Sequence, residues 1–231
     1  MAMPYVIFTD LETGQAFNSF YSYGLILSQQ EIGVPPVKTK TIDIEGAQGS
    51  IDMTEAFDEV FYKDRTLTFT FSIVTDILGW DVIRTKIGNE LHGRKMKIQI
   101  YSDMGKYYIG RCFVDKYQSS KTLGTIIIKC TCEPFKYADR EWTYNLNTTK
   151  IETLETELEF DYTVHSIAFY CNTWQATGNT IFVINNIPFV VTEKRQEILF
   201  PIKIRPTLGE PIKLKIKGMG TIKLKAIQRF I

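Results

Sequence analysis

The sequence has few of the residues from which metal sites, catalytic sites and disulfide frameworks are built. Its 231 residues include two histidines, His92 and His165, and four cysteines. Four cysteines are too few to staple a chain of this length, so we expect reduced thiols in the core. Cys130 and Cys132 are separated by one residue, whereas zinc sites usually use a two-residue spacing and four ligands. A metal site is therefore disfavoured.

The sequence also lacks an excess of either charge and a long apolar run. Lys+Arg 27 against Asp+Glu 26 gives a formal charge of +1, which creates no field that would draw nucleic acid or an anionic membrane to the chain. No apolar run approaches the ~20 residues that cross a bilayer, and the N-terminus has no basic segment followed by an apolar core. We expect a protein made in a cytosol, with no membrane partner and no sequence-specific grip on DNA.

Motifs of catalysis and cofactor binding are missing as well. The sequence has no glycine-rich phosphate loop, no G-x-S-x-G and no H-E-x-x-H. His92 follows a helical stripe at its C-terminal end, where a structural role is favoured. Four carboxylates cluster in the sequence, but nothing indicates a pair that converges in a cleft; they are Asp52, Glu55, Asp58 and Glu59. The sequence predicts no enzyme and no cofactor.

Alternating residues predict that most of the chain is β-structure. In Thr66–Ile73 (TLTFTFSI) the apolar residues occupy every second position and the hydroxyl residues occupy the others, which is typical of a strand with one wet face. The turn sequence Ser102–Gly105 predicts a hairpin between two further strands. The same alternation recurs in Lys95–Tyr101, Tyr107–Val114 and Thr125–Cys132.

One segment, Gly79–His92, is predicted to be a helix. Its apolar residues recur at three- and four-residue spacing, which produces an apolar stripe. Asp76 or Asp81 is a candidate N-cap, and Gly93 stands where a helix commonly ends in a left-handed conformation. One helix among many strands predicts a mainly β fold. The stripe consists of Trp80, Ile83, Ile87 and Leu91.

The alternation stops near Pro134, which suggests a domain boundary. We expect a domain over 1–135, a linker over 136–150 and a second strand-rich domain over 151–231. In the second domain, Asn185-Asn186 resembles a two-residue hairpin turn.

Near the C-terminus, Ile212–Lys217 and Thr221–Ala226 flank Gly218-Met219-Gly220 and predict a hairpin with a basic face. That face could bind a polyanion, or its lysines could pair across strands with the acidic alternation over 155–161; the second interpretation is favoured. The lysines are Lys213, Lys215, Lys217, Lys223 and Lys225, and the acids are Glu155, Glu157, Glu159 and Asp161.

Trp142 and Trp174 could be sugar-stacking platforms, but packing is the favoured role.

Six short motifs occur in an order that resembles the distal tail protein (Dit) family of long-tailed siphophages. The likeness covers nearly the whole chain and is strongest over the first 135 residues. The motifs are Tyr23-Gly24-Leu25; Pro35–Gly46 leading into Gly49–Asp52; Tyr62-x-x-Arg65; Trp80 through NELHGRK, which contains Leu91, His92 and Gly93; YYIGR, which contains Gly110 and Arg111; and Glu133–Tyr137, which contains Pro134.

The resemblance implies an N-terminal tail-tube-like β-barrel or sandwich with one flanking α-helix, and a C-terminal galectin-like β-sandwich. It also implies a homohexameric ring that joins the tail tube to the baseplate or tail tip and lets DNA pass. The implied partners are other copies of the chain, the tail-tube protein, a tail-tip protein of the tail-associated lysin (Tal) type, and receptor-binding or baseplate proteins at the C-terminal domain. The implied location is the virion's tail tip.

Physical constraints extend this expectation. A closed ring covers the exposed edges of a small open sheet. Because each lysine that neutralises a phosphate adds binding, we expect a neutral or acidic lumen, with the lysine-rich segment 212–226 outside it. The alternative function is a carbohydrate-binding adhesion module. The chain has no room for an inserted sugar-binding module after residue 140, so docking to a baseplate protein is favoured.

Overall fold

The computed structural model describes residues 3–46, 48–54, 56, 60–74, 77–120, 123–158, 164–172, 180–191, 198–199 and 211–231. Most of these residues lie in strands, so the prediction of a mainly β fold is confirmed. The chain divides into two compact units, Met1–Lys136 with Ile231, and Tyr137–Phe230. Among the described residues no helix is long and apolar enough to cross a membrane.

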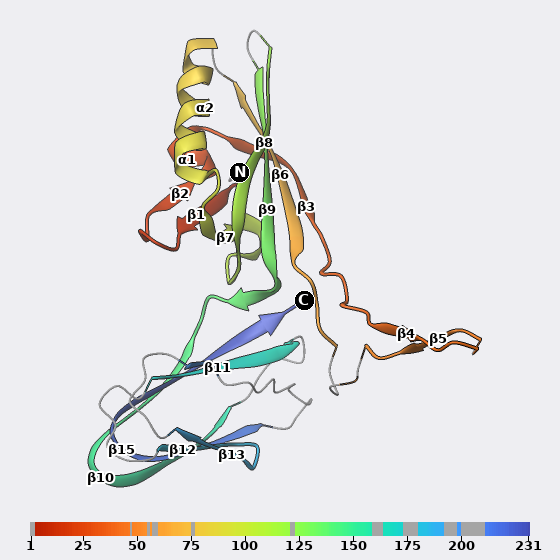
Figure 1. Cartoon of the computed structure of the whole chain (residues 1–231). Helices are drawn as coiled ribbons and strands as arrows, with labels where there is room; N and C mark the ends of the chain where they lie inside the picture. The colour runs from red at the N-terminus through yellow and green to blue at the C-terminus, as the bar shows by residue number, and fades with distance from the viewer. Residues whose placement is uncertain are drawn as a thin grey trace. The chain divides into compact units, whose positions relative to one another are not determined.

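The first unit is an antiparallel sheet with a helix against it (Figure 1). Its strands stand in the order β3-β6-β9-β8-β7-β1-β2. A separate two-stranded sheet is formed by β4 and β5. The elements are β1 (Val6–Asp10), β2 (Ala16–Asn18), α1 (Ser19–Tyr23), β3 (Ile26–Ile32), β4 (Thr41–Asp43), β5 (Ser50–Asp52), β6 (Arg65–Val74), α2 (Ile77–Leu91), β7 (Lys95–Ile100), β8 (Lys106–Ser119) and β9 (Leu123–Ala138).

The core of the first unit follows from the alternation in β6. Leu67, Phe69 and Phe71 are completely buried, whereas the hydroxyl residues between them lie on the other face. The ring of Phe8 from β1 meets Phe69 edge-on, with 6.1 Å between centroids. Because β1 and β6 are far apart in the strand order, this contact shows that the sheet curls around its own core.

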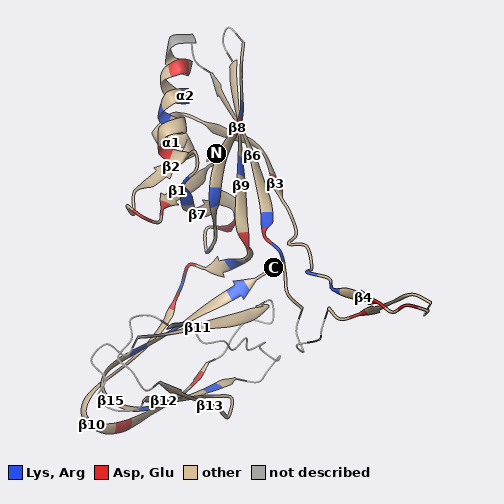
Figure 2. Cartoon of the chain, in the orientation of Figure 1, with Lys and Arg blue, Asp and Glu red and all other residues tan. Residues whose placement is uncertain are grey.

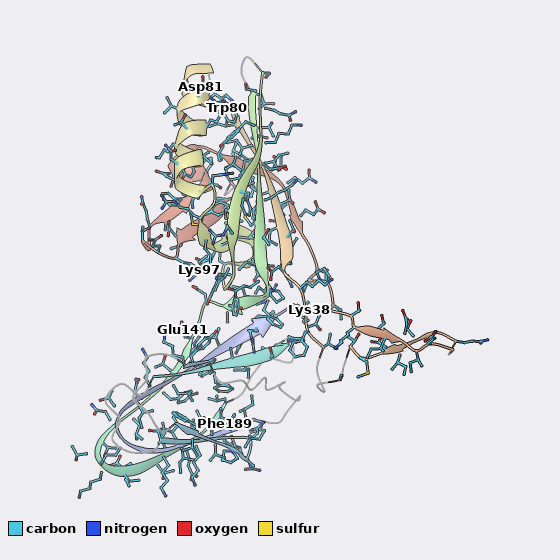
Figure 3. All side chains as sticks on the ribbon, viewed as in Figure 1. Lys38, Trp80, Asp81, Lys97, Glu141 and Phe189 are labelled. Carbon is cyan, nitrogen blue, oxygen red and sulfur yellow. The ribbon has the colours of Figure 1, made fainter. Side chains whose placement is uncertain are left out.

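Helix α2 covers this core with its apolar stripe. Trp80, labelled in Figure 3, packs edge-on against Tyr117 of β8, and a Cβ atom at Gly124 of β9 would lie 2.6 Å from the indole. The helix ends before Gly93, whose φ of 79° confirms the predicted left-handed conformation. Asp81 is not the N-cap, because the helix begins at Ile77; Asp81 instead pairs with Arg84 at 3.2 Å. The other candidate, Asp76, lies outside the described residues.

Two strands are longer than their alternation predicted. β8 continues to Ser119, and β9 continues through Pro134 to Ala138. Between β7 and β8 the chain makes a 3-10 turn over Tyr101–Asp103 before it reverses, so the link is wider than the predicted tight hairpin. Most of the expected linker 136–150 is strand, because β10 begins at Trp142. Cross-strand hydrogen bonding therefore continues where apolar periodicity is lost.

The second unit is organised around one long strand, β15 (Ile212–Phe230). β15 pairs antiparallel with β10 (Trp142–Leu158) over most of its length, with β12 (Thr180–Ile184) near its start and with β11 (Ser166–Asn172) near its end. β13 (Ile187–Val191) and the short β14 (Ile198–Leu199) complete the described strands. The turn at Asn185 and Asn186 is confirmed, because both have positive φ, of 46° and 68°.

The predicted hairpin at Gly218–Gly220 is wrong, because β15 runs straight through these residues. The segments on both sides of the glycines pair with β10 and not with each other, and their buried side chains alternate with exposed or partly buried ones. The irregularity lies instead in β10, whose register with β15 shifts between Thr148 and Glu152. The buried residues are Ile212, Leu214, Ile216, Ile222, Leu224 and Ala226.

The favoured interpretation of the basic face is confirmed in part, because Lys217 and Lys223 lie opposite the uncharged Thr153 and Asn145. Lys215 lies opposite Glu155 in the register and forms an ion pair with it, and Lys213 lies opposite Glu157. Lys225 pairs with Glu141 at 3.5 Å. Glu159 and Asp161 lie outside the described residues.

Candidate assembly surfaces

The described residues hold no group of three side chains suited to a metal ion. A hollow of about 410 Å³ in the first unit contains Asp10 and Arg94, whose Oδ2 and Nη1 atoms are 2.7 Å apart. The hydrogen bond from Arg94, with backbone N–H donors of Glu12 and Thr13, lowers the pKa of Asp10. The carboxylate is therefore held ionised as a structural ion-pair partner, which does not fit a general acid or base.

Five of the motif residues meet at the end of α2. Leu91 is buried beneath the helix, and His92 Nδ1 accepts a hydrogen bond from the N–H of Val114. The Gly93 N–H donates to the carbonyl of Cys112, and Arg111 Nη1 donates to the carbonyl of Gly93. These bonds fasten the helix end to β8. The fifth residue, Gly110, lies in β8 directly beneath Cys132 of β9.

A second group surrounds the start of β6. Tyr62 meets Phe135 edge-on at 6.0 Å, one residue beyond Pro134 in β9. Arg65 is 3% exposed and its guanidinium lies over the Tyr108 ring at 5.6 Å. Its Nε and Nη2 atoms have no hydrogen-bond partner among the described residues, and burial lowers the pKa of Arg65.

The remaining motif residues also hold local structure. The hydroxyl of Tyr23 donates to Glu90 of α2, and burial together with this bond raises the pKa of Tyr23. Gly24, with φ 70°, ends α1. Asp52 at the end of β5 accepts from the N–H and the hydroxyl of Thr54, and these bonds lower the pKa of Asp52. With Trp80 in the core, the motif residues stabilise separate parts of the first unit and do not converge on one site.

The three described cysteine side chains are buried free thiols, as the sequence predicts. The sulfur atoms of Cys112 and Cys130 are 3.2 Å apart, and burial raises the pKa of Cys130.

Trp142 packs against the core of the second unit, and the Arg140 guanidinium lies 5.0 Å from its ring. Trp142 is therefore not a free platform for a sugar. Trp174 lies outside the described residues.

The β4–β5 ribbon is the clearest candidate assembly surface (Figure 1). Ile42 and Ile51 face one another across the two strands, and Ile44 and Met53 follow at two-residue spacing on the same face. These four side chains are 44%, 49%, 49% and 36% exposed. The other face carries Thr41, Asp43, Ser50 and Asp52. The ribbon is amphipathic, and its apolar face is uncovered within the described chain.

Basic and acidic residues also occupy different parts of the ribbon. Figure 2 shows basic residues where the chain enters it and acidic residues beyond them. These are Lys38 and Lys40, then Asp43, Glu45 and Asp52. In the sequence this segment stands out as part of a family motif, and the two-residue spacing of Ile42-Ile44 and Ile51-Met53 also indicates a one-sided ribbon.

Comparison with known proteins identifies the fold. No protein-family model and no curated protein sequence matches the chain. Among solved structures, the match with the Dit protein of phage SPP1 has a TM-score of 0.61 and 13% identity and covers 100% of both chains. The chain has the Dit fold. SPP1 Dit is described as a paradigm of the hub adsorption apparatus in phages that infect Gram-positive bacteria.

A second match, to the insecticidal delta-endotoxin Cry8Ea1 of Bacillus thuringiensis, has a TM-score of 0.22 and 8% identity and covers 99% of this chain and 52% of that one. A likeness this weak carries no argument. The Dit fold, by contrast, extends over both units, so the expected fold class is confirmed for the N-terminal and the C-terminal half alike.

Proposed function

We propose that this chain is a structural, non-enzymatic hub of a phage or prophage long tail. In this proposal it forms a hexameric ring that joins the tail tube to the tail tip and lets DNA pass through its centre. The observation that carries the proposal is the full-length match to a Dit hub protein. The uncovered apolar face of the β4–β5 ribbon supports it independently.

The ribbon favours a second copy of the chain as its partner. An isolated two-stranded ribbon is marginally stable in water, so its apolar face requires cover. Because a ribbon on one copy would dock on a different surface of the next, the contact is heterologous, and it closes into a ring when the rotation allows. Self-assembly therefore follows from the same feature that leaves the isolated chain with exposed isoleucines.

The other partners follow from the position of a hub. We propose that the ring contacts the tail-tube protein on one side and a tail-tip protein of the Tal type on the other. The second unit would dock receptor-binding or baseplate proteins. The protein would accordingly be located at the tail tip of the virion.

The ring is tested by light scattering and negative-stain imaging of the purified chain, which should show particles of six subunits. The variant Ile42→Lys/Ile51→Glu places an ion pair in register on the apolar face, so it keeps the ribbon paired but removes its apolar surface. We expect this variant to remain folded and to lose the ring. The control Thr41→Lys, which faces Asp52 on the opposite side, should retain it.

Wild-type chain that stays monomeric at every concentration, both alone and with its tail-tube partner, would contradict the proposal. A ring that survives Ile42→Lys/Ile51→Glu would remove the ribbon from the interface and leave the hub function in place.

A further inference from the structure

One exterior face of the first unit is rich in hydroxyl groups. In β6 these side chains alternate with the buried Leu67, Phe69 and Phe71, so they point away from the core. Thr66 lies opposite Thr131 of β9, and Ser72 lies opposite Thr125. We call this surface the hydroxyl face; it consists of Ser28, Thr66, Thr68, Thr70, Ser72, Thr125 and Thr131.

Hydrogen bonds and an ion pair keep this face close to neutral. Ser28 Oγ donates to the Thr70 carbonyl at 2.9 Å, and Ser72 Oγ donates to Ser28 Oγ at 3.2 Å. Lys129 lies among the hydroxyl residues, opposite Thr68, and its Nζ is 2.9 Å from Asp115 Oδ2. Glu31 lies opposite Thr68 on the other side. The positive charge on the face is thus balanced by nearby carboxylates.

Other exterior surfaces of the same unit are more basic. Lys95 and Lys97, the second labelled in Figure 3, project from β7 at two-residue spacing; Lys95 pairs with Glu133 at 3.0 Å, and the Lys97 ammonium lies 4.4 Å from the centroid of the Tyr107 ring. The exposed side of α2 carries Lys86 and Arg84, the second paired with Asp81. The first unit therefore has one hydroxyl-rich face around a single lysine, and other faces that carry two cations each.

The strands that carry the hydroxyl face end in open edges. Among the described residues β3 pairs with β6 alone, so its outer side has no strand partner. At the other end of the layer β3-β6-β9-β8, β7 pairs with β8 only over Tyr108–Arg111, and the residues after α2 bond to Cys112 and Val114. Beyond Val114 that side of β8 has no partner strand in the described chain. In a ring, the open sheet edge of one subunit can lie beside the open edge of the next. The same face of every sheet then points toward the centre of the ring.

We propose that the hydroxyl face lines the central channel and is the surface that duplex DNA slides past. This inference rests on the proposed ring. Each lysine that neutralises a phosphate adds a salt-dependent binding contribution, and a ring repeats every lysine once per subunit. A hydroxyl-rich face with one ion-paired lysine adds little such binding, whereas the Lys95–Lys97 surface would bring two lysines per subunit to the duplex.

Thiol labelling of assembled rings tests this arrangement. Thr66→Cys places a thiol on the hydroxyl face, and the matched control Thr85→Cys places one on the exposed side of α2. Both thiols should react with a small maleimide. A large poly(ethylene glycol) maleimide should modify Thr85→Cys, while modification of Thr66→Cys should be lost, because a narrow channel excludes the polymer. In urea both variants should react equally with both reagents.

The outcomes separate this inference from the ring itself. If no variant forms rings, the hub proposal fails and the channel with it. If Thr66→Cys rings react with the large reagent as fast as Thr85→Cys rings, the hydroxyl face is outside and the inference is overturned. If Thr66→Cys rings resist the small maleimide too, the face lies in a subunit contact, which also overturns it.

A second pair of variants tests whether the small number of cations on the hydroxyl face is what lets the duplex pass. Thr66→Lys adds one cation per subunit to the hydroxyl face, and Thr85→Lys adds the same charge to α2. Thr66→Lys rings should retain a short blunt-ended duplex, with log K falling by up to about 0.9 per log unit of salt for each phosphate contacted. Wild-type and Thr85→Lys rings should release it. Equal retention by the two lysine variants would contradict the placement.

Discussion

At the scale of single residues, the first unit depends on glycines that lie in close contact with neighbouring elements. A Cβ atom at Gly124 would overlap the Trp80 indole, and one at Gly110 would lie 2.6 Å from the Thr131 carbonyl and still closer to the Cys132 sulfur. Neither glycine has the positive φ that would require glycine for conformational reasons. Close approach between neighbouring elements is therefore what excludes a side chain at these positions.

Gly110→Ala should destabilise the first unit. The added methyl group meets backbone and a buried sulfur, neither of which can swing away, so we expect a loss of about 1–3 kcal/mol in the free energy of unfolding. Gly105→Ala is the matched control, because nothing lies within 4 Å of its Cβ position, and it should change stability by less than about 0.5 kcal/mol. Urea titration followed by tryptophan fluorescence measures both. Equal effects would show that the β8–β9 spacing relaxes freely.

The Asp10–Arg94 pair should give the chain a pH-dependent stability. In the folded state the pKa of Asp10 lies below its ordinary value of 3.8, chiefly because of the hydrogen bond from Arg94. The stabilisation is therefore complete above the unfolded pKa and is lost as the pH falls through the folded pKa. Asp10→Asn should be less stable than wild type by a constant amount above about pH 5, and the difference should shrink in more acidic solution.

Unfolding titrations of both proteins across this pH range provide the measurement. Arg94→Gln is the companion variant, because it removes the partner and should show the same pH profile. A stability difference that persists unchanged into acid would mean that the Asp10 carboxylate does not contribute through its charge.

At the scale of secondary-structure elements, β15 shows how one long strand can unite a domain. Its even-numbered residues from Ile212 to Ala226 are buried except Gly220, and its odd-numbered lysines face solvent or lie partly buried. β10 runs beside it and places acidic residues opposite Lys213 and Lys215, so part of the basic face is balanced within the unit. Gly218 and Gly220 break the apolar pattern without ending the strand.

Two adjacent substitutions in β15 should therefore have very different effects. Leu224→Ala removes a completely buried side chain and should cost about 2–5 kcal/mol. Lys223→Ala truncates the exposed neighbouring residue and should stay within about 0.5 kcal/mol. Thermal unfolding of the two variants distinguishes them. Comparable losses would mean that the charged face contributes as much stability as the apolar one.

What the sequence could predict depended on whether a pattern had one structural meaning. The alternation of Thr66–Ile73 and the stripe containing Trp80 and Leu91 each fit one element, and both were placed correctly. Gly218-Met219-Gly220 fits either a turn or a strand interior, and only the pairing of both flanking segments with β10 decides between them. Residues 142–150 form a strand through pairing with β15, a partner that local periodicity does not reveal.

The candidate surfaces were harder to predict from the sequence than the helices and strands. The hydroxyl face joins residues of β3, β6 and β9, which are far apart in the chain and meet only through the sheet register. The buried state of Arg65 likewise depends on Tyr108, which arrives from another strand. The ribbon is the exception, because the positions of Ile42, Ile44, Ile51 and Met53 are readable from local spacing alone.

At the scale of the whole molecule, the chain contains two hydrophobic cores. The first is built from residues between Val6 and Cys132, and the second from residues between Ala138 and Phe230. No residue belongs to both clusters. Each core includes several completely buried aromatic side chains, so each unit has its own source of stability; examples are Phe8, Phe69 and Phe71 in the first, and Phe169 and Phe182 in the second.

We therefore expect calorimetry of the chain to resolve two unfolding transitions. Phe69→Ala opens a cavity in the first core and should lower one transition by about 3–5 kcal/mol of unfolding free energy, and Phe182→Ala should lower the other by a similar amount. The two variants serve as controls for each other, because each removes the same side chain from a fully buried site. Two-state behaviour applies to single domains, so separate cores predict separate shifts. If both variants instead moved one common transition, the two units would unfold as a single cooperative block, and a hub built from an independently folded ring domain and docking domain would lose its physical basis.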